Sequence, residues 1–220
     1  MLYPIYNIIY VDPPWTYNDR KLVRLDGKVP KAGMGAGNHY QCMANAEMAA
    51  LEIPILAAEN CALFLWVTGP HLFSPMELIN GWNAQVKLKK NQFRYTNKAF
   101  CWQKITVKGN TFPGRGHWNF HNTEDCLLFM KGSFEVQKIV HEEIRVPHQR
   151  GSDNKIIHSR KPAVVRDRIV EMFGDLPRIE LFATERTPGW DCTGFGVDGR
   201  DIRDFLRECR EKQIELAEVA

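Results

Sequence analysis

The sequence IYNIIYV at residues 5–11, followed directly by Asp12-Pro13-Pro14-Trp15, decides the fold. Residues 5–11 are uncharged and rich in Ile, Tyr and Val, which predicts a strand buried on both faces, as in a parallel sheet. The Asp-Pro-Pro-Trp turn then lies at the carboxyl end of that strand. Because ligands bind at this edge of open α/β sheets, a carboxylate and an indole placed here predict a ligand-binding crevice.

The same turn has the chemistry to bind an amino group. Neither proline has a backbone N–H and both hold φ at about −65°, so the turn is stiff and presents carbonyl acceptors. Asp12 can accept one hydrogen of an exocyclic amine and the Pro13 carbonyl the other, while Trp15 offers a flat face for a heteroaromatic ring. A nucleobase held in this way would have its amine nitrogen aimed at a methyl donor. The alternative is that the prolines simply end a strand and that Trp15 is an ordinary core aromatic.

The composition is that of one globular domain. The chain has 220 residues, 44% of them hydrophobic and 25% charged, which is enough for a central sheet covered on both faces. No apolar run reaches the ~18 residues of a membrane span and no secretory signal is evident, so we expect a cytoplasmic protein without membrane association. Six scattered cysteines without a C-x-x-C pair predict reduced thiols. His117 and His121 lack the accompanying Glu of a zincin motif, so no metal site is expected.

The net charge of +3 conceals an uneven distribution, because residues 78–123 contain no Asp or Glu. The basic residues of this segment are Lys87, Lys89, Lys90, Arg94, Lys98, Lys104, Lys108 and Arg115. Such a segment predicts a face that binds a phosphate backbone, and we expect it to be the target-recognition region. Lysines that protect a strand edge from aggregation are the alternative.

The remaining pattern alternates strands and helices. Further strands are predicted at residues 61–67, 99–107, 125–130, 134–144 and 179–183, and helices at residues 47–56, 71–81, 158–173 and 200–217. This order predicts an α/β fold with a doubly wound, mostly parallel sheet. Strands 99–107 and 125–130 are joined by a loop without a helical pattern, so we expect an antiparallel pair at a sheet edge. The long polar loops at 17–38, 108–123 and 145–157 are expected near the crevice, the first of them as a lid.

Several motifs together resemble the MT-A70 family of adenine-N6 methyltransferases. They are the Asp-Pro-Pro-Trp turn, FLWVTG at 64–69, GHW at 116–118, HSRKP at 158–162 and ELFA at 180–183, in the family's order, and the similarity spans residues 7–197. The resemblance implies a Rossmann-like methyltransferase fold with a permuted motif order. It also implies S-adenosylmethionine as the donor and the N6 amino group of adenine in nucleic acid as the acceptor.

The resemblance also implies roles for individual residues. The expected catalytic residues are Asp12, Pro13, Pro14 and Trp15. The expected cofactor-binding residues are Asp12, Lys161, Glu180, Phe182 and Thr184. The expected substrate-binding residues are Tyr17, Lys87, Lys89, Lys90, Arg94, His117, Trp118, Asn119 and Arg150. Lys161 would pair with the methionine carboxylate of the donor, and Thr184 would lie along its ribose.

The chain departs from the family pattern at two points. Thr184 stands where an Arg is usual, and Phe195-Gly196 stand where Asn and Gln, or Asn and Glu, often occur. We expect a stand-alone enzyme of a bacterial or phage-infected cell that acts on DNA rather than RNA. An RNA methyltransferase and a catalytically silent nucleic-acid-binding subunit are the alternatives, and a homodimer is left open.

Overall fold

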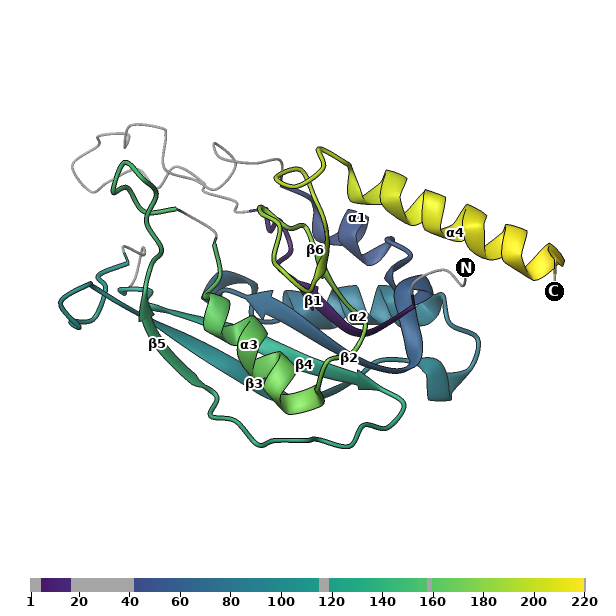
Figure 1. Cartoon of the computed structure of the whole chain (residues 1–220), viewed down its shortest axis with the longest axis horizontal. Helices are drawn as coiled ribbons and strands as arrows, with labels where there is room; N and C mark the ends of the chain where they lie inside the picture. The colour runs from purple at the N-terminus through teal and green to yellow at the C-terminus, as the bar shows by residue number, and fades with distance from the viewer. Residues whose placement is uncertain (1–4, 17–41, 115–118, 158–159, 220) are drawn as a thin grey trace.

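The computed structural model describes residues 5–16, 42–114, 119–157 and 160–219. Within these residues seven strands form one sheet in the order β5-β3-β4-β2-β1-β6-β7 (Figure 1). The strands are β1 (Tyr6–Val11), β2 (Ala57–Val67), β3 (Arg94–Ile105), β4 (Thr123–Lys131), β5 (Glu143–Pro147), β6 (Arg178–Leu181) and β7 (Asp191–Thr193). The α-helices are α1 (Asn45–Ala49), α2 (Ser74–Ala84), α3 (Ala163–Phe173) and α4 (Ile202–Val219). Short 3-10 helices are η2 (Ile53–Leu56), η3 (Gly69–His71) and η4 (Lys89–Asn91).

The sheet is mostly parallel, as predicted. β1 pairs in parallel with β2 and β6, β6 with β7, and β3 with β5. Only β4, among the described strands, runs in the opposite direction, antiparallel to both β2 and β3. The predicted antiparallel pair is therefore confirmed, but its expected place at the sheet edge is wrong, because β5 covers the outer side of β3.

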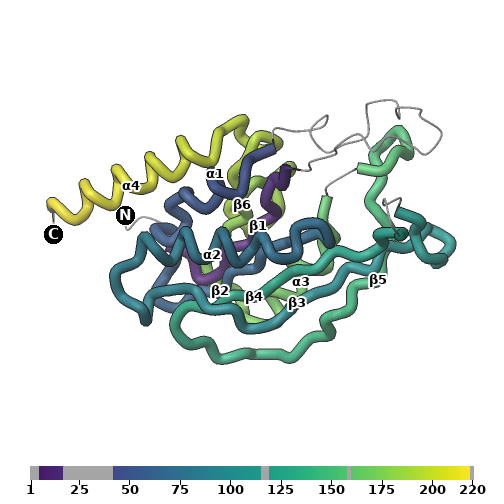
Figure 2. The backbone as a smooth tube through the Cα atoms, turned by 180° about the vertical axis from the view of Figure 1, so that it is seen from behind, coloured from purple at the N-terminus to yellow at the C-terminus, as the bar shows by residue number. Residues whose placement is uncertain are grey.

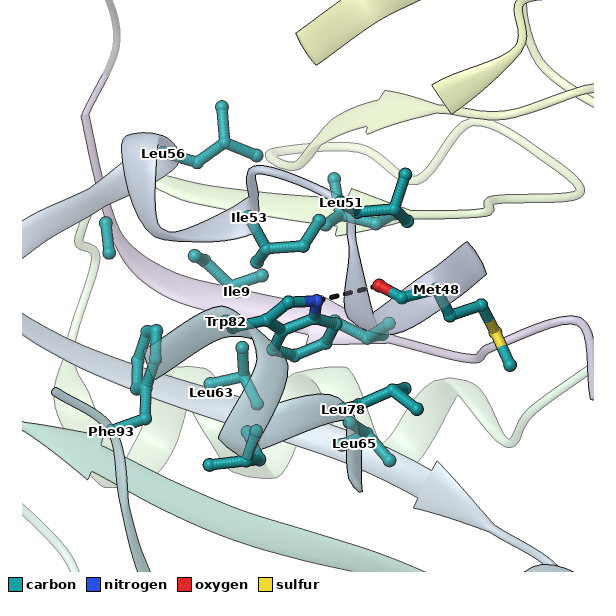
Figure 3. Packing of buried hydrophobic residues seen from close by; sticks show 14 of the residues in the cluster. Ile9, Met48, Leu51, Ile53, Leu56, Leu63, Leu65, Leu78, Trp82 and Phe93 are labelled. Atoms are coloured by element: carbon teal, nitrogen blue, oxygen red, sulfur yellow. Dashed lines mark hydrogen bonds between the residues drawn. The ribbon is translucent and has the colours of Figure 1, made fainter. Parts of the chain in front are cut away.

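The core lies on both faces of the sheet because side chains alternate along each strand. On β1, Ile8 and Tyr10 join the cluster beneath α3, whereas Ile9 and Val11 join the cluster beneath α1, α2 and α4. In Figure 1, α3 accordingly lies in front of the sheet and α2 behind it. In the second cluster Trp82 of α2 donates its indole N–H to the carbonyl of Met48, over a distance of 2.8 Å, and so ties α2 to α1 (Figure 3).

Several element boundaries differ from the expected ones. The strand predicted at 134–144 is wrong, because most of this segment crosses the edge of the α3 layer, where the Gln137 N–H bonds the Met172 carbonyl. The edge strand β5 begins with the last two residues of that segment and continues into residues expected to be a loop, and the short strand β7 was not predicted. α3 begins at Ala163, five residues later than expected, and Pro162 is its N-cap. The helix expected at 47–56 is divided, because α1 ends at Ala49 and Pro54 lies in η2.

Helix α4 packs its apolar face on the sheet side of the molecule, as predicted. Ile202, Leu206 and Cys209 are buried, and Gln213 bonds the Ile55 carbonyl over 2.8 Å. Its amino end therefore lies at the same edge of the sheet as the loops after β6 and β7. Among the described helices, none has the length and apolar character that crossing a bilayer requires.

Candidate active site

A cavity of about 970 Å³ opens at the carboxyl ends of β1, β6 and β7. Its walls come from the turn after β1, the loop before α3, the segments after β6 and β7, and the first turn of α4. The lining residues are Asp12, Pro13, Pro14, Met43, Asp153, Lys155, Ile156, Ile157, Phe182, Ala183, Thr184, Gly194, Phe195, Gly196, Arg200, Asp201, Ile202 and Arg203. This is the edge at which the sequence predicted a crevice.

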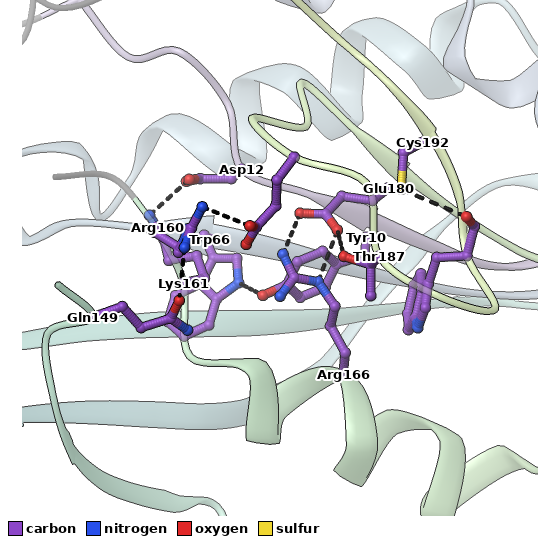
Figure 4. A network of polar contacts seen from close by, with 12 residues as sticks. Tyr10, Asp12, Trp66, Gln149, Arg160, Lys161, Arg166, Glu180, Thr187 and Cys192 are labelled. Carbon is purple, nitrogen blue, oxygen red and sulfur yellow. Dashed lines mark hydrogen bonds and ion pairs between the residues drawn. The ribbon is translucent and has the colours of Figure 1, made fainter. Parts of the chain in front are cut away.

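Asp12 lies at the wall of this cavity with its side chain about 24% exposed. Its Oδ2 accepts a hydrogen bond from the Lys161 ammonium at 2.7 Å (Figure 4). Burial raises the pKa of the Asp12 carboxyl above its ordinary value, and the charge of Lys161 opposes that rise. The sequence prediction that this carboxylate faces a ligand site is consistent with its position.

Lys161 is placed differently from the sequence expectation. The side chain is only 8% exposed and is held between two carboxylates, Asp12 and Glu124, the latter at 3.2 Å. Its ammonium lies 5.5 Å from the centre of the Trp66 ring. Although burial would lower the pKa of Lys161, the two carboxylates raise it, so the side chain stays charged. Lys161 is not among the cavity-lining residues, and its visible contact is with Asp12 rather than with the space for a donor carboxylate.

Glu124 is a site residue that sequence reasoning missed. It accepts a hydrogen bond from Lys104 in addition to its ion pair with Lys161. Burial would raise the pKa of Glu124, but the two ammonium groups hold it at about 2. The one sequence signal was that Glu124 is the first acidic residue after a long basic segment. Its partners follow only from the pairing of β3 with β4 and from the position of the chain before α3.

Trp15 is buried, with 3% of its surface exposed, and does not line the cavity. One face of the indole stacks on His71, with ring centroids 5.1 Å apart and planes 13° from parallel. The indole N–H is donated to the Trp66 carbonyl at 3.2 Å. The expectation of an open stacking face is therefore wrong in this structure, and the alternative, a core aromatic, is what is observed. Trp15 anchors the turn that carries Asp12.

The two prolines hold the turn through their carbonyls. Pro13 accepts the Trp15 N–H at 2.8 Å, and Pro14 accepts the Met43 N–H at 2.9 Å. A carbonyl oxygen has two lone pairs, so Pro13 keeps one acceptor site for a ligand amine. Both prolines line the cavity, as predicted.

Three residues at the end of β6 were expected to contact the methyl donor, and two of them line the cavity. Phe182 and Thr184 do so, whereas Glu180 does not. Both Glu180 oxygens accept hydrogen bonds from the Arg166 guanidinium, at 2.6 and 2.7 Å, in a buried pair beneath α3 (Figure 4). Phe182 has φ of +58°, a left-handed conformation that is strained for a residue with a side chain and that typically occurs at functional sites.

The wall after β7 is built from closely packed backbone. A Cβ atom on Gly194 would lie 2.6 Å from the Ala183 carbonyl oxygen, and one on Gly196 would lie even closer to the Thr184 backbone. Only glycine fits at such contacts. Asp198 holds the turn by accepting the Gly194 N–H at 3.2 Å. This packing presents Phe195 to the cavity, a contact that the sequence had marked only as a departure from the family pattern.

The basic residues at 87–94 lie at the amino ends of the parallel strands, whereas the cavity lies at their carboxyl ends. α2 runs back from the carboxyl edge, so the chain leaves it at the amino edge and enters β3 there. Arg94 pairs with Met130, whereas the carboxyl-edge pair of the same strands is Gln103 with Thr123. Figure 2 shows the α2–β3 connection at the end of the sheet remote from the β3–β4 turn. Lys87, Lys89, Lys90 and Arg94 therefore do not gather at the cavity.

The other expected substrate contacts have mixed outcomes. Tyr17, His117 and Trp118 lie outside the described residues, as does the expected lid at 17–38. Asn119 is exposed. Arg150 lies on the loop that lines the cavity, with its guanidinium bonded to the Asn154 carbonyl at 2.6 Å. The cations that do line the cavity were not predicted; they are Lys155, Arg200 and Arg203.

The sequence of this chain is similar to those of known methyltransferases. The sequence profile of the MT-A70 family matches residues 6–196. The Type II methyltransferase M.MunI of Mycoplasma sp is 30% identical over 213 residues, which cover 90% of this chain and 80% of that protein. The N(6)-adenosine-methyltransferase MT-A70-like of Arabidopsis thaliana is 27% identical over 92% of this chain and 25% of its own length. The human N(6)-adenosine-methyltransferase catalytic subunit METTL3 is 27% identical over 94% of this chain and 30% of its own length. The chain belongs to the MT-A70 family of adenine-N6 methyltransferases.

Proposed function

We propose that this chain transfers the methyl group of S-adenosylmethionine to the N6 amino group of adenine in DNA. The observation that carries the proposal is the position of Asp12, a carboxylate at the end of β1 that lines a cavity and is held by Lys161 through one oxygen. The other oxygen is then available to accept a hydrogen bond from the amine of a base in the cavity.

The cavity fits the proposed donor. Small-molecule sites commonly have volumes of about 300–1,000 Å³, so about 970 Å³ leaves room for a nucleoside-sized donor and a flipped base together. Phe182 and Phe195 supply aromatic surface for a purine, Thr184 supplies a hydroxyl that suits a ribose, and Lys155 and Asp201 supply charges that suit an amino-acid zwitterion. S-adenosylmethionine, when bound, supplies an electrophilic methyl group on a sulfonium centre.

The residues of the chain then position and stabilise the amine. Asp12 accepts one N–H, and the remaining lone pair of the Pro13 carbonyl accepts the other, which aims the nitrogen lone pair away from the ring. The amine gains positive charge as it is methylated, and the Asp12 carboxylate stabilises that charge electrostatically. Trp15 keeps the turn in place from behind, through its bond to Trp66. No general base has to act before the new bond forms.

We propose DNA as the polymer because the similarity to a Type II methyltransferase extends over 80% of that relative, whereas the adenosine methyltransferases are matched over only 25–30% of their length. An adenine in a duplex must leave the stack to reach the cavity. Arg200 and Arg203 at the cavity, with Arg150 nearby, would contact the flanking phosphates. A cytoplasmic location, a homodimer and an outlying phosphate contact at residues 87–94 stay predictions.

The test measures methyl transfer to DNA and to RNA of one sequence. After incubation with labelled S-adenosylmethionine, both polymers are digested to nucleosides and N6-methyladenine is quantified in each. Wild type should methylate DNA, and Asp12→Ala should lose about 100- to 1,000-fold in rate while remaining folded. Asp175→Ala, an exposed carboxylate at the amino edge, is the matched control and should retain activity.

Two results would overturn the proposal in different ways. Methylation confined to RNA would show that RNA, and not DNA, is the substrate polymer. The absence of heat in a calorimetric titration of wild type with S-adenosylmethionine would favour a catalytically silent subunit.

A further inference from the structure

Four charged side chains of alternating sign, each at most about a quarter exposed, form a chain that ends at the cavity. Lys104 of β3 bonds Glu124 of β4, Glu124 pairs with Lys161 at 3.2 Å, and Lys161 bonds Asp12 at 2.7 Å. The exposed fractions of the four side chains are 15%, 13%, 8% and 24% in that order. Four segments that are distant in sequence thus meet beside the turn after β1.

Glu124 is the fixed member of this chain. Each of its oxygens has its own cation, Oε1 with Lys104 and Oε2 with Lys161. Its strand β4 lies inside the sheet, paired on both sides. Lys161, in contrast, is a point charge on a flexible stem that by itself could take several directions. The direction that it takes, toward Asp12 and over the ring of Trp66, is the one that Glu124 supports from the other side.

We infer that Glu124, braced by Lys104, is a positioning residue for methyl transfer, which directs Lys161 onto Oδ2 of Asp12 and keeps Oδ1 turned to the cavity. The inference rests on the role proposed for Asp12. Glu124 itself does not line the cavity, so it acts through Lys161 rather than on a ligand.

The charge balance of the group has a second effect. Two cations and two anions cancel, so the developing positive charge on the amine faces the Asp12 carboxylate without a net positive neighbourhood. Neutralising Glu124 would leave one excess positive charge close to the reacting nitrogen, in a site where charges are poorly screened. The rate of transfer should therefore fall even if substrate binding is unchanged.

The loss of Glu124 should also change the pKa of Asp12. Burial raises the pKa of Asp12, Lys161 lowers it, and Glu124 and Glu180 raise it further. The buried Cys126 thiol on β4 stays neutral, because burial raises its pKa well above the ordinary range. The other charged side chains that line the same cavity are Asp153, Lys155, Arg200, Asp201 and Arg203. If Glu124 positions Lys161, removing Glu124 should raise the pKa of Asp12, because the loss of the Lys161 contact outweighs the loss of the smaller raising influence of Glu124.

The decisive variant is Glu124→Gln, compared with Asp125→Asn. Asp125 is the next residue on β4 and contacts Lys98, in a 3.8 Å ion pair, and the Cys101 thiol, so it is a matched control outside the charge chain. For Glu124→Gln we expect kcat at the pH plateau to fall about 10- to 100-fold with little change in KM. The acid limb of the pH–rate profile should move to higher pH, because Lys161 no longer holds Asp12. Asp125→Asn should change neither quantity. A wild-type plateau rate, or an acid limb that does not move, would overturn the inference.

A second variant and a measurement without substrate distinguish the positioning role from a folding defect. Lys104→Met with Glu124→Gln removes one charge of each sign, so this double variant should fold like wild type and still show the displaced acid limb. The titration of Asp12 is followed by ¹³C NMR of carboxyl-labelled aspartate, assigned with Asp12→Asn. If wild type transfers no methyl group but the Asp12 titration moves in Glu124→Gln, the proposed function fails and the positioning contact stands. An unmoved titration rejects the positioning role.

Discussion

The two edges of the sheet use charge in different ways. At the carboxyl edge, Asp12, Lys161 and Glu124 are largely buried and paired with one another beside a cavity. At the amino edge, the cations between α2 and β3 are exposed and line no described part of that cavity. The number of charges in a sequence segment therefore says little about where chemistry occurs. The direction in which each strand runs decides which charges reach the ligand.

The largest effect should follow from Lys161→Met. This change leaves Asp12 and Glu124 buried near one another without their shared cation, which should cost about 3–5 kcal/mol of stability. It also removes the charge that lowers the pKa of Asp12, so the acid limb of activity should move to higher pH, in the same direction as for Glu124→Gln and further. Urea unfolding and a pH–rate profile measure the two effects. An acid limb that moves to lower pH would show that Lys161 does not set the charge of Asp12.

A comparable loss of stability, without a loss of the reaction, is expected for Glu180→Gln. The change breaks the buried pair with Arg166 and should destabilise the fold by about 3 kcal/mol or more. Because Glu180 does not line the cavity, the folded fraction should bind S-adenosylmethionine with nearly wild-type affinity. Calorimetry at a temperature where the variant is folded checks this. A large loss of affinity would restore the original expectation that Glu180 contacts the donor.

Low pH should reduce the free energy of unfolding because Glu124, at the carboxyl edge, becomes protonated. Its pKa is held at about 2 in the folded protein, below the ordinary value of 4.5, so it stabilises the fold fully above pH 4.5 and progressively less as pH falls toward 2. The contribution is on the order of 3 kcal/mol. The difference in unfolding free energy between wild type and Glu124→Gln should therefore shrink between pH 4.5 and 2. The exposed Asp175→Asn is the control, and its difference should stay small throughout.

The smallest effect should come from the amino edge. Replacing Lys87, Lys89 and Lys90 by Ser removes three exposed charges that do not line the cavity. The rate of transfer at saturating DNA should be unchanged, and any loss of affinity should be confined to low salt, where distant charges are less screened. Steady-state kinetics at two salt concentrations test this. A fall in the saturated rate would mean that the amino edge takes part in the reaction itself.

Much of the site could be predicted because its signals are local. A run of Ile, Tyr and Val specifies β1, and the prolines after it stop the strand, so the position of Asp12 at a ligand-binding edge was readable. Phe182 and Thr184, at the end of β6, were expected from the family resemblance. Most of residues 134–144 were misassigned because Phe134 and Val140 pack against the cluster beneath α3 without forming a strand, whereas Val136 and Ile139 are exposed.

The contacts that could not be predicted join segments distant in sequence. Lys161 bonds Asp12 across 149 positions, and Lys104 meets Glu124 across 20. Whether Trp15 faces a ligand or the core depends on where His71 and the Trp66 carbonyl lie, which no local pattern specifies.

The sequence by itself determined the strand periodicity, the stiff proline turn with its carboxylate, and the family, because each depends on neighbouring residues or on ordered motifs. The tertiary structure alone decided the partners of each charge and the edge at which each charge lies. The physical reason is that side-chain alternation and turn chemistry act over a few residues. Ion pairing and burial depend on strand order and direction, and these are settled only when the whole sheet packs.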